Sequence, residues 1–576
     1  MSKTGQTQSR IDALFQQALA LHQNGALTEA EELYREVLEK KPRHFDATQL
    51  LGTLCLQSGR LDEGVTWLER ATALDARQPA IHSNMAFALN ALGRHDEALA
   101  RADKAVALAP GFADAYNNRG NALASLARPV EALVSFERSI ALQADSPQAW
   151  NNRACAQRDL GQAEAALQSC DRAIALNASY ADAWSNRANA LSDLNRAEDA
   201  KVSYERALAI DPGFADGWSN LGLTLVDLGD HDSALTCYER ALALRPEHAS
   251  AHWNQALCLL ETGRFDKGWA AYEWRWERAT LKAARRTFAQ PLWLGETPIE
   301  GQTILLHAEQ GLGDTLQFCR YAALVARLGA TVILEVPAPL MRLCARLDGV
   351  SVLVEEGQPL PPFDVHTPLL SLPLALGTTL ETIPADIPYL FADASRAAIW
   401  RERIAPLAQN RFRVGLVWAG GHRPHVPELR KTDARRSMSL DQFRPLLAID
   451  SVQCFSLQMG PPAGQLDALR DDPSFSGRIV DLTGPIHDFA DTADLIENLD
   501  LVISVDTSTA HLAAAMGKPV WILNRFDTCW RWLLERDDSP WYPSVRLFRQ
   551  ASLGEWDPVI ERVREALTLA SQHTLR

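Results

Sequence analysis

The most restrictive feature of this sequence is a 34-residue period that runs through its first half. Glycine recurs on this period, with Ala127 and Asn195 at the two intervening places; the glycines are Gly25, Gly59, Gly93, Gly161, Gly229 and Gly263. A small residue such as Ala98 recurs five positions later, and a proline such as Pro110 recurs on a third grid. A fixed period of this length indicates a solenoid in which each repeat packs on its neighbours.

Each repeat predicts two helices joined by a turn. Glycine at the turn allows a left-handed backbone at little cost, and the small residue lets the second helix approach the first closely. Proline then ends the second helix. Eight repeats fit without an insertion, and they begin near residues 11, 45, 79, 113, 147, 181, 215 and 249. The pattern predicts an α solenoid over residues 11–282.

The repeats also resemble a known family. Residues 183–191 (AWSNRANAL), followed by Ala200, Tyr204, Ala207 and Pro212, resemble a tetratricopeptide repeat. This resemblance implies a right-handed superhelix of helix pairs, whose first helices line a concave groove.

Asparagine occupies the sixth position of six successive repeats: Asn84, Asn118, Asn152, Asn186, Asn220 and Asn254. Equivalent positions in stacked repeats form a row, and an amide can both donate to and accept from a peptide backbone. The alternative is that each amide bonds the backbone of a neighbouring repeat, because buried polar groups must pair. The same ladder occurs in the superhelix of the eukaryotic O-GlcNAc transferases, and this resemblance favours peptide binding.

The eighth repeat is rich in aromatic residues: Trp269, Tyr272, Trp274 and Trp276. A cluster of this kind at the end of a solenoid is typical of a cap or of a docking surface for the next domain. We expect residues 283–300, which are aromatic and basic, to complete a rigid junction rather than a platform for a ligand.

After residue 300 the period stops, and short β-branched runs alternate with helical stretches. The clearest predicted strands are 303–307, 331–336, 413–418, 452–457, 501–505 and 520–523. This alternation favours parallel α/β sheets, which we divide into two Rossmann-like lobes at residues 301–400 and 401–576. The proline-rich segment 359–390 is expected to form loops and the connection between the lobes. Ligands of such sheets bind at the carboxyl ends of the strands.

Three motifs follow predicted strands. The first is Gly311-Leu-Gly313-Asp314, where the glycines allow a tight turn and Asp314 is either a functional carboxylate or a helix cap. The second is the Gly420-Gly421 turn with the basic segment 422–436 after it, which contains Lys431, Arg435 and Arg436. We expect this segment to be a loop that binds a diphosphate, the alternative being a solvated surface loop.

The third motif begins at the end of the strand at 501–505 and consists of Asp506, Thr507, Ser508, Thr509 and His511. Hydroxyl residues at a helix start cap the helix and expose backbone amides that suit phosphate oxygens. A lone histidine in this place is more often a packed residue than a catalyst.

Together the three motifs resemble two-lobed (GT-B) nucleotide-sugar glycosyltransferases, in particular the bacterial heptosyltransferase group (family 9). The resemblance covers residues 300–545 and makes Asp314 the catalytic base. The resemblance also implies a set of donor-binding residues, drawn from all three motifs. They are Gly311, Gly313, Gly420, Gly421, Lys431, Arg435, Arg436, Asp506, Thr507, Ser508, Thr509 and His511. Residues 290–576 contain no Asp-x-Asp pair, the usual metal–diphosphate anchor, so we expect no cofactor and a metal-independent reaction.

The joining of a peptide-type groove to a transferase predicts that the acceptor is Ser or Thr of a protein, as in the O-GlcNAc transferase architecture; a secreted or surface protein such as a flagellin is one candidate. Two alternatives remain open. The acceptor can be a lipopolysaccharide or other glycan, with the repeats serving assembly, or the chain can be a non-catalytic scaffold.

Composition limits the partners. The chain has 57 Lys and Arg against 72 Asp and Glu, a net charge of −15, which argues against nucleic acid binding. Nine cysteines without a Cys-x-x-Cys pair argue against a disulfide framework or a zinc site. Residues 1–10 lack the apolar core of a signal peptide, and no apolar stretch is long enough to span a membrane. We therefore predict a cytoplasmic protein.

Overall fold

The computed structural model describes residues 3–421, 427–470 and 472–574. Within them the chain forms two compact units, Met1–Leu228 and Gly229–Arg576, and each is described by itself.

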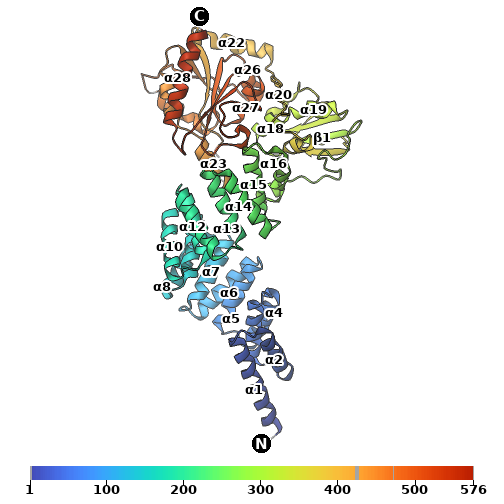
Figure 1. Cartoon of the computed structure of the whole chain (residues 1–576), viewed down its shortest axis with the longest axis vertical. Helices are drawn as coiled ribbons and strands as arrows, with labels where there is room; N and C mark the ends of the chain where they lie inside the picture. The colour runs from blue at the N-terminus through green and yellow to red at the C-terminus, as the bar shows by residue number, and fades with distance from the viewer. Residues whose placement is uncertain (1–2, 422–426, 471, 575–576) are drawn as a thin grey trace. The chain divides into compact units, whose positions relative to one another are not determined.

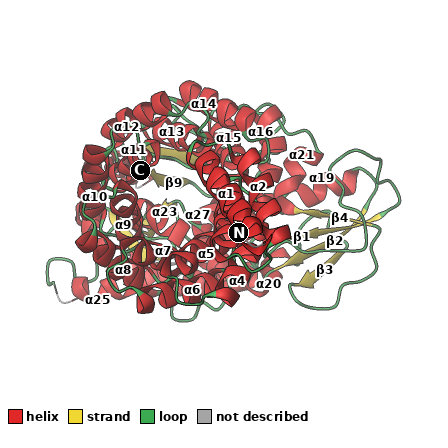
Figure 2. Cartoon of the chain, turned by 90° about the horizontal axis from the view of Figure 1, so that it is seen from below, coloured by secondary structure: helices red, strands yellow, loops and turns green. Residues whose placement is uncertain are grey.

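The first unit consists of paired helices that follow one another along the chain (Figure 1). They are α1 (Lys3–Gln23), α2 (Leu27–Lys40), α3 (Phe45–Gln57), α4 (Leu61–Leu74), α5 (Pro79–Ala91), α6 (His95–Leu108), α7 (Ala113–Ser125), α8 (Pro129–Leu142), α9 (Pro147–Asp159), α10 (Ala163–Leu176), α11 (Ala181–Asp193), α12 (Ala197–Ile210) and α13 (Ala215–Asp227). Viewed from below, α5 to α12 follow an arc (Figure 2). The predicted tetratricopeptide superhelix is confirmed.

The turn geometry explains the 34-residue period. All six glycines of the grid have a positive φ, between 74° and 81°, within each helix pair. Ala127 and Asn195, the two exceptions, are held in the same left-handed region at φ 57° and 56°. Because this conformation is strained for residues with a side chain, glycine is favoured at the other turns.

The small residue of each repeat lies where two helices cross. A Cβ atom on Gly64 would lie 2.3 Å from Cδ2 of Leu56, and one on Gly268 would lie 2.6 Å from Cδ2 of Leu260. Alanine is fully buried at the equivalent places, for example Ala98 and Ala200. Larger side chains would force the helices apart.

The second unit begins with the end of the solenoid, formed by α14 (His231–Leu244), α15 (Ala249–Glu261), α16 (Phe265–Tyr272), the 3-10 turn η1 (Glu273–Glu277) and α17 (Ala279–Lys282). The aromatic residues of the eighth repeat pack against the domain that follows. The indole nitrogen of Trp269 donates to the Thr378 carbonyl at 2.9 Å, and its ring meets Trp530 edge-on at 5.3 Å between centroids. This repeat is therefore docked on the α/β region.

The first lobe is built on a four-stranded parallel sheet in the order β3-β2-β1-β4. Its elements are β1 (Thr303–His307), α18 (Leu312–Phe318), α19 (Tyr321–Arg327), β2 (Thr331–Val336), η2 (Ala338–Leu340), α20 (Met341–Cys344), β3 (Val352–Glu355), β4 (Val365–Pro368), η3 (Leu369–Ser371) and α21 (Leu372–Ala375). In β1, Ile304 and Leu306 face α18 and α19, whereas Leu305 faces Phe288 and Phe363.

One expectation for this lobe was wrong. The segment 359–390 was predicted to be loops and a connection, but it contains β4, which pairs with β1 in the register Ile304↔Val365. Pro368 ends that strand at the edge of the sheet, a place where proline is tolerated because no further donor is needed.

The second lobe has a six-stranded parallel sheet in the order β10-β9-β8-β5-β6-β7. Its strands are β5 (Phe412–Val417), β6 (Val452–Ser456), β7 (Ile479–Asp481), β8 (Leu501–Val505), β9 (Val520–Asn524) and β10 (Val545–Arg549). Its helices are α22 (Ala394–Ala408), α23 (Pro427–Arg436), η4 (Leu440–Phe443), α24 (Arg444–Leu447), η5 (Pro461–Gly464), α25 (Gln465–Arg470), α26 (Phe489–Ile496), α27 (Ser508–Ala515), η6 (Trp530–Trp532) and α28 (Asp557–Thr574). Alternate residues of β8 face α28 on one side, as Ile503 does, and α27 on the other, as Val502 does (Figure 1).

Both sheets are consistent with the expected GT-B lobes. In each, the strand order reverses beside the first strand, at β1 and β4 in the smaller sheet and at β5 and β8 in the larger one. The loops that leave such neighbouring strands diverge and open a crevice at the carboxyl edge, where open α/β sheets bind ligands.

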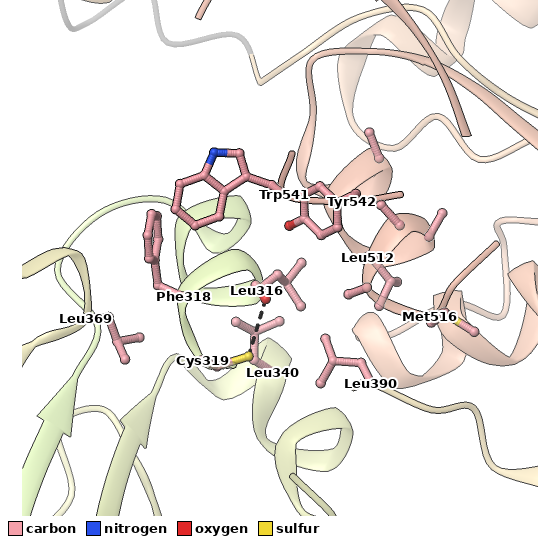
Figure 3. Packing of buried hydrophobic residues seen from close by; sticks show 14 of the residues in the cluster. Leu316, Phe318, Cys319, Leu340, Leu369, Leu390, Leu512, Met516, Trp541 and Tyr542 are labelled. Atoms are coloured by element: carbon pink, nitrogen blue, oxygen red, sulfur yellow. Dashed lines mark hydrogen bonds between the residues drawn. The ribbon is translucent and has the colours of Figure 1, made fainter. Parts of the chain in front are cut away.

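The two lobes share one hydrophobic cluster. Leu316 and Phe318 of the first lobe meet Leu512, Trp541 and Tyr542 of the second in a continuous buried core (Figure 3). This packing fixes the loop after β1 against the start of α27. Among the described residues, no helix is long and apolar enough to cross a membrane.

Candidate functional site

The three motifs predicted from the sequence lie at the carboxyl ends of strands, one in the smaller sheet and two on adjacent strands of the larger sheet. The Gly311–Asp314 turn follows β1, the Gly420-Gly421 turn follows β5, and residues 506–511 follow β8. Because β5 and β8 are adjacent and parallel, the second and third motifs share one edge of the larger sheet. The first motif reaches them through contact between α18 and α27.

Gly313 lies where the first lobe contacts the start of α27. A Cβ atom on Gly313 would lie 3.2 Å from Cδ2 of His511 and 3.4 Å from Cα of Ser508. The acidic turn and the hydroxyl-rich helix start therefore touch each other directly, and glycine leaves room for that contact.

We expect Gly313→Val to weaken the interface between the lobes. The added methyl groups must displace backbone of α27, and overpacking of this kind costs about 1–3 kcal/mol. Thermal unfolding of the full chain measures the loss. Gly484→Val is the matched control, since a Cβ atom there meets nothing within 4 Å; equal destabilisation by both variants would contradict the proposed contact.

Asp314 is held by both of its carboxylate oxygens. Oδ2 accepts from the Gly311 backbone N–H at 2.8 Å, three residues before it, so Asp314 caps the first turn of α18. Oδ1 accepts from the Arg531 guanidinium. The side chain keeps 22% of its surface exposed, so an incoming hydroxyl can still reach it.

Arg531 is a site residue that the sequence reasoning missed. It lies in η6, is only 8% exposed, and also donates through Nε to Gln317 Oε1 at 2.7 Å. Its guanidinium lies 4.1 Å from the centroid of the Trp530 ring, and the neighbouring Asp314 raises its pKa against the effect of burial. The only signal in the sequence was an arginine between two tryptophans, which does not reveal a partner 217 residues away.

The hydroxyl-rich motif forms a capped helix start. Thr507 Oγ1 accepts from the Ala510 backbone N–H at 3.4 Å and lies 2.9 Å from Ser504 Oγ, so it is used within the lobe. Asp506, Ser508 and Thr509 are half-buried at the same edge. Thr507 is thus occupied within the lobe, whereas the donor-binding roles of Ser508 and Thr509 stay predictions.

His511 is buried within this contact between the lobes. Nδ1 lies 3.0 Å from the Tyr542 hydroxyl, the ring stacks on Trp532 at 5.3 Å, and Nε2 lies 3.8 Å from Asp506 Oδ1. Burial lowers the pKa of His511 to about 4, although Asp506 opposes the shift. The imidazole is therefore neutral at physiological pH, which suits a positioning or hydrogen-bonding residue.

The buried histidine makes stability depend on pH. Between pH 4 and 6.5 the unfolded chain binds a proton at His511 that the folded chain does not, so stability falls as pH falls through this window. The loss reaches about 3 kcal/mol at pH 4 if the whole shift is expressed. We expect His511→Gln to flatten the dependence of the free energy of unfolding on pH in this window, as measured by denaturant titrations. His487→Gln, which removes an exposed histidine, is the control and should leave that dependence unchanged.

The basic segment is partly helical, which corrects the expectation of a loop over 422–436. Residues 427–436 form α23, while 422–426 lie outside the described residues. Arg436 packs over the glycine turn, since a Cβ atom on Gly420 would lie 2.4 Å from its Nε. Helix formation follows from the run of Glu, Leu, Arg and Lys after Pro427, a residue favoured in a first helical turn.

Two basic side chains of α23, those of Arg435 and Arg436, are already paired within the lobe. Arg435 donates to Asp527 Oδ2 at 2.8 Å, and Arg436 forms an ion pair with Asp433 at 2.7 Å. Asp527 follows β9, so Arg435 leans across the carboxyl edge on which the other motifs lie. The side chain of Lys431 lies outside the described part of the structure, and its donor-phosphate role stays a prediction.

The asparagine ladder is half-buried, and three of its amides bond to the preceding repeat. Asn118 Nδ2 donates to the Ser83 carbonyl at 3.0 Å, Asn152 Nδ2 donates to Asn117 Oδ1 at 3.1 Å, and Asn186 Nδ2 donates to Asn151 Oδ1 at 2.9 Å. In all three the nitrogen is used between repeats. These bonds agree with the alternative that the amides bond to neighbouring repeats. Because they use the amide nitrogens, peptide binding would depend on the amide oxygens.

Within residues 3–421, 427–470 and 472–574, no group of three or more His, Cys, Asp or Glu side chains is arranged to hold a metal ion.

The fold and the site define a class: a helical repeat solenoid joined to a two-lobed α/β region of the GT-B kind. Sequence models of the tetratricopeptide repeat match residues 21–86, 79–104, 147–180, 181–214 and 219–274. The model described as glycosyltransferase family 9 (heptosyltransferase) matches residues 457–523, which include the hydroxyl-rich motif. The chain thus combines N-terminal tetratricopeptide repeats with a glycosyltransferase family 9 (heptosyltransferase) domain, as the sequence motifs predicted.

A curated relative and several solved structures are similar to parts of the chain. Protein FlbA of Caulobacter vibrioides is 27% identical over 318 residues, which are 52% of this chain and 51% of FlbA, so the chain spans about half the length of that relative. The Cut9-Hcn1 hetero-tetramer of the APC/C is 18% identical, with a TM-score of 0.39 over 42% of this chain and 48% of the other. A tetratricopeptide repeat protein from Parabacteroides merdae is 17% identical, with a TM-score of 0.38 over 43% of this chain and 98% of the other.

Proposed function

We propose that this protein is a glycosyltransferase that moves a sugar from a nucleotide-sugar donor to Ser or Thr of a protein docked in the repeat groove. The observation that carries the transferase part is the meeting of the acidic turn after β1 with the start of α27, through Gly313, Ser508 and His511. This contact brings a carboxylate of one lobe to the helix start of the other, where backbone amides are suited to phosphate oxygens.

The proposed reaction is a direct displacement at the anomeric carbon. Asp314 takes the proton of the acceptor hydroxyl while negative charge develops on the departing nucleotide diphosphate. In the structure Asp314 is paired with Arg531. We infer that the donor diphosphate draws the guanidinium to itself, which frees the carboxylate to act as a base and supplies positive charge to the leaving group.

The remaining donor contacts follow from the shared strand edge. The Gly420-Gly421 turn and α23 with Arg435 and Arg436 lie after β5, and Ser508 and Thr509 lie after β8. Backbone amides and fixed cations at this edge suit a diphosphate without a metal ion. The family 9 domain supports a nucleotide sugar as the donor. Which sugar is transferred depends on the shape of the donor-binding site.

We expect sugar transfer to be independent of divalent metal. The chain offers arginines and backbone amides for the diphosphate charge in place of an Asp-x-Asp pair. Turnover in excess EDTA should stay within about twofold of the untreated rate. Loss of turnover in EDTA, restored by Mg²⁺ or Mn²⁺ but not by Ca²⁺, would contradict the proposal.

The proposed protein acceptor rests on the repeats. In the ladder of the first unit, Asn118 and Asn152 use their nitrogens between repeats, and among the described residues no donor meets their side-chain oxygens. Such oxygens can accept from the backbone N–H groups of an extended chain. A glycan acceptor is the second candidate, and the match to the heptosyltransferase family is the observation that favours it.

The test separates the two acceptors. Asn220→Ala combined with Asn84→Ala removes two ladder amides for which no hydrogen bond to another described side chain is present. We expect these variants to raise KM for a protein acceptor several-fold and to leave slow hydrolysis of the donor unchanged. Equal loss of both activities would count against recognition in the groove. A cytoplasmic location is part of the same proposal, because nucleotide sugars are made there.

A further inference from the structure

A cavity of about 590 Å³ lies at the junction between the last repeat and the first lobe, entirely within the second unit. It is walled by the start of α15, by α16, by η1 and by the connecting segment before β1. Its size falls in the range of small-ligand sites. It is separate from the residues at the carboxyl ends of β5 and β8, and none of the roles proposed above uses it.

The charge of the cavity lining is acidic. Glu247, Glu273 and Glu277 contribute carboxylates, and Arg285 is the one basic residue among those lining it. Glu247 is exposed and makes no ion pair with another described residue, whereas Glu277 pairs with the exposed Lys282 at 2.9 Å. A cation entering the cavity therefore finds an uncompensated carboxylate at its rim.

The cavity also has an aromatic wall. Trp274 stacks on His252, with 3.8 Å between centroids and 8° between planes, so one face of its indole is fixed while the residue stays half-buried. Trp276 already carries the guanidinium of Arg275 at 4.6 Å and that of Arg285 at 5.9 Å from its centroid. Indole faces attract cations, and these contacts show that arginine fits this part of the chain.

We propose that this cavity, hereafter the junction pocket, binds a lysine or arginine side chain of the protein acceptor. This inference rests on the proposed function, since it names a feature of its acceptor. The aliphatic stem of such a side chain lies against Trp274, Leu292 and Leu294, and its charged end reaches Glu247 and Glu277. A neutral saccharide could pack against the Trp274 ring, but it would leave the carboxylates without a cation.

The pocket is connected to the acidic turn by hydrogen bonds. Glu273 lines it and accepts from Arg275 at 2.6 Å and from Ser371 at 2.8 Å. Arg275 in turn donates to Glu309 at 3.0 Å, in the loop that leads to Asp314. A cationic side chain in the pocket is thus linked, through Glu273 and Arg275, to the loop that carries the proposed base.

Binding is tested on the full chain by isothermal titration calorimetry, without any donor. The probes are Gly-Lys-Gly-Lys-Gly and its arginine counterpart, with Gly-Glu-Gly-Glu-Gly and maltotriose as comparisons. We expect the two cationic peptides to bind and to weaken as salt is raised, and the comparisons not to bind. Glu247→Gln with Glu277→Gln should weaken the cationic peptides at least about tenfold, and Trp274→Ala should do so as well.

Glu561→Gln with Glu565→Gln, on α28, is the matched control that removes two exposed carboxylates far along the chain; it should leave peptide binding unchanged. Equal weakening by the control and the pocket variants, or binding of maltotriose in place of the cationic peptides, would overturn the inference. If cationic peptides bind in the pocket but the protein transfers no sugar, the pocket is supported and the proposed function is refuted. Transfer to acceptors regardless of their Lys and Arg content would do the reverse.

Discussion

Arg531→Met is expected to lower the rate of sugar transfer by about 100-fold or more while the chain remains folded. The guanidinium is nearly buried, is bonded to Asp314 and Gln317, and is the cation that the second lobe places on the acidic turn of the first. Loss of one preorganised group that stabilises transition-state charge typically costs about 10²–10³ in kcat. Steady-state kinetics with a nucleotide-sugar donor measures the effect, mainly in kcat.

The comparison variants separate a role in charge from a role in folding. Arg531→Lys keeps the charge but not the two-pronged geometry, so we expect it to recover part of the rate. Arg536→Met removes another arginine of the same segment, one whose side chain pairs with the nearby Asp538 at 2.6 Å, and should keep the full rate. A normal rate in Arg531→Met, or an equal loss in Arg536→Met, would refute the assignment.

Arg275→Met is expected to lower the free energy of unfolding by about 3–5 kcal/mol, the usual cost of removing one partner of a buried ion pair. Arg275 has no exposed surface, pairs with Glu273 and Glu309, and lies between the rings of Tyr272 and Trp276. Its removal leaves two carboxylates without a cation at the junction. Chemical denaturation of the full chain gives the change.

The pH dependence of that loss checks its cause. Burial raises the pKa of Glu309 to about 7 even with Arg275 beside it. A raised carboxyl pKa contributes stability below the unfolded value of 4.5 that is lost as pH rises through 7. Without Arg275 the penalty for ionising Glu309 grows, so the difference from the wild type should be larger at pH 8 than at pH 5. A pH-independent difference, or an equal loss in Lys282→Met, which changes an exposed residue, would point to altered packing instead.

The sequence was most informative where structure repeats locally. The glycine grid predicted left-handed turns, which the structure has at Asn195, a residue type that tolerates this conformation, and even at Ala127, where the residue type gave no support. The strands at 303–307 and 501–505 were predicted to the residue, because a buried parallel strand reads as a short β-branched run. The three motifs were placed on the correct strand ends for the same reason.

The misses concern residues whose structure depends on distant partners. Strand β4 ends at Pro368 in a proline-rich segment, and only its pairing with β1 makes it a strand. The basic segment was expected to be a loop, although 427–436 is a helix that packs Arg436 on Gly420. In the ladder, the choice of Ser83 or Asn117 as a partner depends on how two repeats stack.

The amino-acid sequence alone determined the repeat solenoid, the two α/β lobes and the chemical character of the strand-end motifs, because these follow from period, residue type and short spacing. Only the tertiary structure decided that Gly313 touches Ser508, that Arg531 pairs with Asp314, and that Arg275 is buried between the last repeat and Glu309. Such contacts join residues tens to hundreds of positions apart, and the free energy that selects them comes from burial and charge pairing in the folded chain, which no local pattern records.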